Sequence, residues 1–360
     1  MRVRVVTCWF PSRVNPGSGS FVATDAAALS RVHDVGVVHL VAPALDDGVR
    51  RDVAGGVPVI RFPMSTTSPS SIARAAVALR PLLRDADVVH TMAFPSLLPL
   101  RLLAPAAPAV HTEHWSGIPR MGTGRFGSAK RRIAGAIYRV PDVVAAVSEY
   151  LARAVAGVSG RGVEVIPNIV QSPGLRPRRC PDGSIRLLSI GALKAVKDPG
   201  LALATLAELR RRGHDARLTW VGDGPLAAGV ADDAERLGVR AAVTLTGALP
   251  REAIRDQLDR ADVLLHTSTI ETFSLVAAEA LGAGRPVVIQ SEGGHTDFVR
   301  PPFGRLVRER TPEAFADGVE AAVAAAANAD PAEISAEITS RFSEDAFVER
   351  WTEVYERVAR

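Results

Sequence analysis

The chain has 360 residues, enough for two domains of ordinary size that each bury a core. Hydrophobic residues make up 47% of it, as in soluble α/β proteins, and no stretch approaches the run of about eighteen apolar residues that a membrane span needs. Residues 1–172 carry 19 basic and 11 acidic side chains and residues 173–360 carry 24 and 28, so the net charge of +4 divides into +8 and −4. These features predict a cytoplasmic protein whose first half attracts anionic partners. They argue against a nucleic-acid binder, because no basic stripe is interleaved with aromatic residues.

In the first half, apolar runs of strand type alternate with helical patterns. Strands are expected at residues 3–7, 35–41, 57–62, 87–91, 109–112, 142–147 and 163–168. Helices are expected at residues 20–31, 70–84 and 95–104 and after Ser148, which is a suitable N-cap. This alternation predicts a doubly wound domain over residues 1–172.

A segment rich in Pro, Gly and Arg, residues 171–183, is expected to link this domain to a second one. The second domain is expected over residues 184–340. Its strands are expected at residues 185–190, 218–221, 243–245, 261–268, 285–289 and 305–307, and its helices after Pro199, after Glu271 and at residues 251–259, 312–328 and 331–341. A last helix, residues 341–360, carries a packing stripe of Phe347, Trp351 and Tyr355.

Two loops of the first half are candidates for ligand contact. Gly17 and Gly19 lie between the first strand and the first helix, where glycine lets the backbone approach a ligand, although many such loops are only tight turns. His111 lies near the end of the strand at 109–112 and His114 follows it, at the same edge of the sheet. No further spaced ligand group accompanies them, and the two cysteines, Cys8 and Cys180, form no cluster, so no metal site is predicted.

A basic run precedes the strand at 142–147. Residues 120–141 hold six lysines and arginines and no acid, mixed with Phe126, Ile133 and other apolar residues. Such a run is more often a solvated helix face. The alternative is an amphipathic surface that touches lipid or an anionic acceptor.

The loop after the strand at 185–190 concentrates the lysines of the chain. Only three basic residues are lysine, and two of them, Lys194 and Lys197, lie in this loop, just before the helix that begins at Pro199. A compact ammonium group beside a helix N-terminus suits binding of a diphosphate. Gly222, Asp223 and Gly224 follow the next strand, where glycine permits positive φ and close approach to a ligand.

Two glutamates lie in the strand–helix–strand unit at 261–289. Glu271 falls in the loop at the carboxyl end of the strand, and Glu279 falls two turns into the helix among alanines. A carboxylate on the apolar part of a buried helix needs hydrogen bonds, which ribose hydroxyls would supply. The alternative is a helix-start glutamate followed by one structural buried glutamate.

This spacing of the two glutamates, with the loops before and after it, closely resembles the retaining glycosyltransferases of family 4. The resemblance covers nearly the whole chain and implies the GT-B architecture, in which two doubly wound Rossmann-like domains face a cleft. It implies a nucleotide-diphosphate sugar as donor, an acceptor bound mainly by the first domain, and no metal cofactor. The last helix is then expected to return to the first domain.

The resemblance also implies roles for single residues. Lys197, Glu271 and His114 (or His111 in its place) would act at the donor sugar and its diphosphate, and Glu279 would bind the ribose. The remaining donor-binding residues would be Gly17, Gly19, Lys194, Gly222, Asp223, Gly224, Thr272, Phe273, Ser274 and Leu275.

Three positions depart from the family pattern. Ala192 stands where an arginine is usual, and Lys194, Arg285 or another cation is expected to replace it. Ser274 replaces the usual glycine after the phenylalanine of the motif, and Asp297 shortens a usual glutamate. The loss of the arginine favours a second hypothesis, a non-catalytic subunit that keeps the fold. A nucleotide-sugar epimerase is a third, but no convincing pair of acid–base carboxylates supports it. Donor sugar, base and acceptor stay open.

Overall fold

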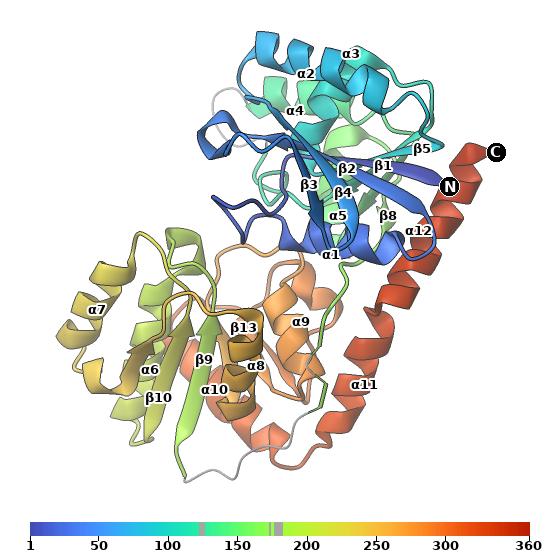
Figure 1. The fold of residues 1–360 in the computed structure, drawn as a ribbon. Coiled ribbons are helices and arrows are strands. Elements are labelled where there is room, and N and C mark those ends of the chain that lie inside the picture. Colours follow the sequence, from blue (N-terminus) through green and yellow to red (C-terminus); the bar gives the residue numbers. More distant parts are fainter. Residues whose placement is uncertain (122–126, 173, 176–182) are drawn as a thin grey trace. The chain divides into compact units, whose positions relative to one another are not determined.

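The computed structural model describes residues 1–121, 127–172, 174–175 and 183–360 (Figure 1). Arg125, Phe126, Cys180 and most of the expected linker therefore lie outside the described residues. The chain divides into two compact units. Unit 1 comprises Met1–Ile169 and Glu344–Arg360, and unit 2 comprises Val170–Ser343. No helix in the described ranges is long and apolar enough to cross a membrane.

Unit 1 is built on an eight-stranded sheet in the order β3-β4-β2-β1-β5-β6-β7-β8. The strands are β1 Arg2–Thr7, β2 Asp34–Val41, β3 Arg51–Ala54, β4 Val57–Pro63, β5 Val88–Met92, β6 Ala109–Glu113, β7 Val143–Ala146 and β8 Glu164–Val165. All pairs are parallel except β3 with β4. The chain leaves β1 in one direction and later returns on its other side, so β1 and β5 flank the switch point where sheets of this kind bind ligands.

Helices cover both faces of this sheet, which is why its central strands are almost continuously apolar. The helices are α1 Ser20–Leu29, α2 Pro69–Leu82, α3 Leu97–Leu103, α4 Gly127–Ile137, α5 Glu149–Ser159 and α12 Glu344–Ala359, with short 3₁₀ turns η1 Pro43–Leu45 and η2 Phe94–Ser96. Val3 and Val5 pack with α1 and α12, whereas Val6 packs with α2 and α3. The stripe Phe347, Trp351 and Tyr355 belongs to the first of these cores.

Unit 2 is built on a six-stranded, wholly parallel sheet in the order β11-β10-β9-β12-β13-β14. Its strands are β9 Ile185–Ile190, β10 Ala216–Val221, β11 Val243–Leu245, β12 Val263–His266, β13 Val287–Gln290 and β14 Gly304–Val307. Its helices are α6 Pro199–Arg211, α7 Ala227–Arg236, α8 Arg251–Arg260, α9 Leu275–Gly282, α10 Pro312–Ala326 and α11 Pro331–Arg341, with 3₁₀ turns η3 Ala195–Lys197, η4 Arg240–Ala242 and η5 Gly294–Asp297. β9 and β12 flank the switch point of this second sheet.

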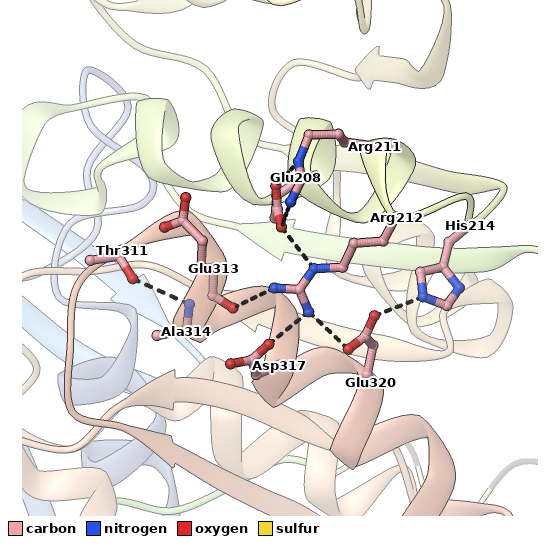
Figure 2. A network of polar contacts seen from close by, with 9 residues as sticks. All are labelled: Glu208, Arg211, Arg212, His214, Thr311, Glu313, Ala314, Asp317 and Glu320. Atoms are coloured by element: carbon pink, nitrogen blue, oxygen red, sulfur yellow. Dashed lines mark hydrogen bonds and ion pairs between the residues drawn. The ribbon is translucent and has the colours of Figure 1, made fainter.

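A network of charged side chains ties α6 to α10 in unit 2 (Figure 2). Arg212, at the end of α6, contacts Glu208 on its own helix at 2.8 Å and Asp317 and Glu320 on α10 at 2.6 and 2.9 Å. His214 contacts the other oxygen of Glu320 at 2.8 Å. One guanidinium group therefore holds the carboxylates of two helices that cover the same face of the sheet.

Candidate functional site

Three charged or polar side chains meet at the switch point of unit 2. Lys197 lies in the loop after β9, His266 ends β12, and Glu271 lies in the loop after β12. The Glu271 Oε1 atom accepts hydrogen bonds from Lys197 Nζ at 2.7 Å and from His266 Nε2 at 2.8 Å. Burial raises the pKa of Glu271, but His266 and Lys197 outweigh it, so the pKa lies far below its ordinary value and the carboxylate is ionised.

The loop after β9 that carries Lys194 and Lys197, the lysine loop, is held in place by Arg310, which sequence reasoning missed. Asp198 adopts left-handed φ (48°) and caps α6 through a hydrogen bond from the Leu201 amide. Arg310 donates to Asp198 Oδ2 at 2.6 Å and to the Thr267 carbonyl at 2.8 Å, so it ties the loop after β9 to the end of β12. Arg310 follows the last strand in a chain rich in arginine, and no motif marked it.

The loop that carries Glu271 contacts the loop of Gly293 and Gly294, which follows β13. The Gly294 amide donates to the Glu271 carbonyl at 2.9 Å, and a Cβ on Gly293 would lie 2.9 Å from that same carbonyl oxygen. Phe273 is buried against Phe298 and Phe342, with ring centroids 5.2 and 5.3 Å away, so its side chain belongs to the core.

The residues after Phe273 turn the chain into α9. Ser274 is the N-cap of this helix and is one of four non-glycine residues with positive φ, at 72°, in the described ranges. Leu275 begins the helix, so the amide groups of its first turn point toward the region of Thr272 and Glu271. The position of the helix N-terminus thus agrees with the expectation from the sequence.

Glu279 meets a partner that the sequence did not identify. Its Oε1 atom accepts a hydrogen bond from Arg251 Nη2 at 2.8 Å, and the side chain is 20% exposed. Burial still raises the pKa of Glu279 above its ordinary value in spite of Arg251. The carboxylate therefore keeps one side open and would gain from further hydrogen-bond donors.

The Gly222–Gly224 turn packs directly against the lysine loop. A Cβ on Gly222 would lie 2.1 Å from the Gly191 carbonyl oxygen, and one on Gly224 would lie 2.5 Å from that of Leu193. Gly222 also has φ of 136°. Contact between two backbone loops therefore requires both glycines, whatever ligand they approach. Asp223 is exposed, and its Oδ1 atom accepts from the Gly224 amide.

Of the two named cations that are expected to replace the missing arginine at Ala192, the structure leaves Lys194 and excludes Arg285. Ala192 and Lys194 are both exposed beside Lys197. Arg285, which we considered as a replacement, is excluded because it lies before β13, at the opposite edge of the sheet from the lysine loop. There its Nε atom donates to the Leu258 carbonyl at 2.9 Å, and the side chain is buried.

In unit 1, His114 follows β6 at the carboxyl edge of the sheet. Glu113 fixes the loop, because its Oε1 atom accepts from the amides of His114 and Trp115 at 2.9 and 2.8 Å. Burial lowers the pKa of His114 to about 3, so its ring is neutral, and it lies against Phe21 with centroids 4.5 Å apart. His111 is fully buried between Thr91 and Glu113, which assigns it a structural place.

The two glycines of the first loop differ in their surroundings. Gly19 is the N-cap of α1 with φ of 62°, and a Cβ there would lie 2.3 Å from the Trp9 carbonyl oxygen. Gly17 is exposed, and a Cβ there would have nothing within 4 Å. Within the described parts of both units, no three His, Cys, Asp or Glu side chains lie close enough together to hold a metal ion.

Comparison with known proteins places these loops in a family. A sequence model described as "Glycosyl transferases group 1" matches residues 176–336, and one described as "Glycosyltransferase Family 4" matches residues 17–172. A GDP-mannose-dependent alpha-(1-6)-phosphatidylinositol monomannoside mannosyltransferase of Mycobacterium tuberculosis is 28% identical over 354 residues, which are 88% of each chain. An alpha-D-kanosaminyltransferase of Streptomyces kanamyceticus is 33% identical over 158 residues, which are 41% of this chain and 38% of that one.

Solved structures share the fold across both units. Sucrose-phosphate synthase of Thermosynechococcus elongatus has a TM-score of 0.81 and 18% identity, covering 99% of this chain and 98% of that one. HepE of Anabaena, in complex with UDP and glucose, has a TM-score of 0.77 and 18% identity, covering 99% and 100%. These likenesses identify the fold as GT-B and confirm the fold class expected from the sequence.

Proposed function

Because the chain belongs to the family 4, group 1 glycosyltransferases of the GT-B fold, we propose that it transfers a sugar from a nucleoside-diphosphate donor to an acceptor hydroxyl, with retention of anomeric configuration and without a metal ion. Glycosyl transfer from a nucleotide sugar is the activity of the family. Retention and metal independence are our proposals. The observation that carries them is the meeting of Lys197 and Glu271 at the switch point of unit 2, beside the N-terminus of α9.

The proposed reaction breaks the bond between the anomeric carbon and the diphosphate and forms a bond from that carbon to the acceptor oxygen. Positive charge develops on the sugar ring and negative charge on the departing diphosphate. Lys197 and the first amide groups of α9 stabilise that negative charge, because fixed cations and dipoles are most effective where charge develops. The acceptor proton passes to a phosphate oxygen of the leaving group on the same face of the sugar, which gives retention.

The other residues would position the donor. Glu271 binds hydroxyls of the donor sugar, Glu279 binds the ribose, and His114 contributes a neutral ring near the sugar. Lys197 and Glu271 form an ion pair at 2.7 Å, and in the proposed donor complex Lys197 would turn to the diphosphate and Glu271 to the sugar. The nucleotide side of the donor would contact Lys194, in the same loop, and the turn packed against it, Gly222, Asp223 and Gly224.

A thermal-shift panel tests the donor site. GDP-mannose and UDP-glucose come first, because the relatives use or bind them, followed by the free diphosphates and other nucleotide sugars. A ligand at a hundred times its dissociation constant adds about 2.7 kcal/mol of stability. We expect a selective shift that Glu279→Ala abolishes and that the distant carboxylate variant Glu320→Ala keeps. A shift of equal size in both variants would refute the ribose role of Glu279.

Turnover and its stereochemistry test the reaction itself. We expect transfer in the presence of EDTA and an anomer of the same configuration as the donor, read by proton NMR of the product. Inversion, or activity that returns only with added divalent metal, would contradict the proposal. Nucleotide binding without turnover would instead support the non-catalytic subunit, which the alanine at position 192 favours.

Weak contact with an anionic membrane is also part of the proposal. The neighbouring helices α2, α3 and α4 (Figure 1) carry six cations and no carboxylate: Arg74, Arg80, Arg101, Lys130, Arg131 and Arg132. Each helix also bears a highly exposed apolar side chain: Val77, Leu102 and Ile133. Cations beside apolar groups favour an anionic lipid surface. Flotation with phosphatidylglycerol vesicles and none with phosphatidylcholine is expected, and equal flotation with both would contradict it.

A further inference from the structure

A cavity of about 460 Å³ lies inside unit 1, at the carboxyl edge of its sheet. Its walls come from the loops that follow β1, β2, β4, β5 and β6, so it spans the switch point beside β1. This is where a sheet of this topology places a ligand. Its volume falls within the range of about 300–1,000 Å³ that is usual for small-ligand pockets.

The cavity carries no formal charge. No Asp, Glu, Lys or Arg is among its lining residues in the described part of the chain. His39 lines it, and burial together with the nearby Arg61 lowers the pKa of His39 to about 4, so this ring is neutral at pH 7. A phosphate or carboxylate that entered would lose its hydration without gaining a countercharge from any lining residue, since the nearby Arg61 is already paired with Asp52.

The cavity offers apolar faces and neutral hydrogen-bonding groups together. Trp9 and Trp115 both line it, and both are half-buried. Asn15 and Ser18 also line it, and within the described residues their side chains form no hydrogen bond inside the protein. The Nδ1 atom of His39, which is 97% buried, has no partner there either.

The cavity wall is held in place by a buried arginine. Arg61 donates to the Pro11 carbonyl at 3.0 Å and to Asp52 at 2.8 Å, which ties the loop after β1 to β4 and β3. The Ser12 hydroxyl accepts from the Asn15 amide at 3.1 Å and closes the turn within that loop. The polar groups are therefore presented by a pre-organised loop, which lowers the entropic cost of binding.

We propose that this cavity is the acceptor subsite and that it accepts an uncharged, hydroxyl-bearing ring, a neutral glycosyl or cyclitol unit. The apolar C–H face of such a ring packs on Trp9 or Trp115, and its hydroxyls bond to Asn15, Ser18 and His39. The assignment of the cavity to the acceptor rests on the proposed function. The preference for a neutral ring rests only on the lining of the cavity.

Tryptophan fluorescence of the full-length protein tests the preference directly. The probes are the methyl glycosides of glucose, galactose and mannose, myo-inositol, and the 6-phosphates of the three sugars, each up to about 50 mM, well above a millimolar dissociation constant. We expect saturable quenching by at least one neutral probe and at least tenfold weaker binding of its phosphate. Tighter binding of a phosphate, or no binding of any neutral probe, would overturn the proposal.

Substitutions locate the signal. The other tryptophans, Trp220 and Trp351, are buried in the cores of the two units, so Trp220→Phe should keep the quenching while Trp9→Phe with Trp115→Phe should remove it. Asn15→Ala should weaken binding at least fivefold, and the exposed Asn328→Ala should not change it. Quenching that survives the double Trp9 and Trp115 variant would place the sugar elsewhere and refute the assignment.

Binding and transfer separate the two proposals. If a neutral ring binds in the cavity but no donor in the panel gives a product, the proposed function fails and the cavity assignment to a neutral ring stands. If sugar is transferred only to phosphorylated acceptors, the activity stands and the neutral acceptor subsite is refuted. Transfer to the neutral probe that quenches most strongly, lost together with quenching in Asn15→Ala, supports both.

Discussion

At the scale of single residues, the two glycines in the loop after β1 differ in what requires them. The backbone itself requires glycine at position 19, whereas only contact with a ligand would require it at position 17. Gly19→Ala should destabilise unit 1 by more than about 2 kcal/mol, because it combines a left-handed conformation with a clash against backbone. Gly17→Ala should change stability by less than about 0.5 kcal/mol, as for other exposed sites. Urea unfolding measures both variants.

The same pair bears on ligand contact. If Gly17→Ala leaves stability unchanged but weakens donor or acceptor binding, then glycine at position 17 serves close approach of a ligand. If it changes neither, the donor-contact role given to Gly17 by the family resemblance is wrong.

Ser274 stands where the family pattern has glycine, and its backbone conformation is strained. Its φ of 72° is unfavourable for serine, and its buried Oγ atom has no hydrogen-bond partner among the described residues. Ser274→Gly should therefore stabilise unit 2 by about 1 kcal/mol, since glycine adopts this conformation without strain. Ala277→Gly, inside the same helix, should destabilise by a similar amount. Destabilisation by Ser274→Gly would show that the hydroxyl has a partner.

At the scale of elements, the position of the lysine loop depends on Arg310. Arg310→Gln removes the ion pair with Asp198 and loosens the contact between the loop after β9 and the end of β12. We expect the nucleotide-induced thermal shift to fall at least severalfold, while Arg310→Lys restores part of it through the retained charge. A positional role predicts that binding suffers more than the stability of the ligand-free protein. An equal loss in both would indicate a general packing role.

The contact between α6 and α10 depends on Arg212 (Figure 2). Arg212→Ala leaves Glu208, Asp317 and Glu320 without their shared cation, so the melting temperature should fall, and Arg212→Lys should fall less. The pKa of Glu208 is lowered from 4.5 to about 2 by Arg211 and Arg212. A carboxylate with a depressed pKa stabilises the fold above its ordinary pKa and loses this contribution as pH falls. The difference between wild type and variant should therefore shrink between pH 4.5 and pH 2.

Most elements could be predicted from the sequence, and the misses have physical reasons. Buried parallel strands are near-continuous apolar runs, so β9 matches its expected range. β3 was missed because its residues, Arg51–Ala54, are largely exposed and charged, and only pairing with β4 makes them a strand. The expected strand at 163–168 shortens to Glu164–Val165, because Pro167 lacks the amide that continued pairing requires.

At the scale of the whole molecule, sequence reasoning recognised ligand-facing loops better than the side chains that hold them. Lys197 stood out because two of the three lysines lie in one loop after a strand, and Glu271 because of its spacing to Glu279, and the structure brings the two side chains together. Arg251 and Arg310 did not, because their partners lie 28 and 112 residues away in the sequence. Such pairings arise from tertiary packing and have no local pattern.

Acid stability should differ between the two units, because buried neutral histidines are unevenly shared. Unit 1 holds His39 and His114, whose pKa values burial lowers to about 4 and 3, and His33 and His90, whose pKa values burial lowers below the ordinary value. Unit 2 holds His295, whose pKa burial lowers to about 4. Each histidine binds a proton near pH 6.5 only when unfolded, so each reduces stability by about 1.4 kcal/mol per pH unit below that value.

Buried carboxyl groups act in the opposite direction. Burial raises the pKa of Asp25 in unit 1 and of Glu279 in unit 2, so these groups bind protons first in the folded state and offset part of the effect of the histidines in each unit. Each unit has one such carboxyl, whereas unit 1 has four histidines of lowered pKa and unit 2 has one. Between pH 6.5 and 4.5, above the titration of ordinary carboxylates, unit 1 should therefore lose more stability than unit 2.

Fluorescence can follow each unit, because Trp220 is the one tryptophan of unit 2 and the other three belong to unit 1. Urea midpoints at pH 7, 6 and 5 should fall more steeply for a variant that lacks Trp220, which reports on unit 1, than for one that keeps only Trp220, which reports on unit 2. His39→Gln should reduce the slope in unit 1 by about one proton, since glutamine does not titrate. A midpoint for unit 1 that does not change over this range would show that its histidines titrate normally, and His39 would then gain charge inside the cavity as the pH falls below 6.5.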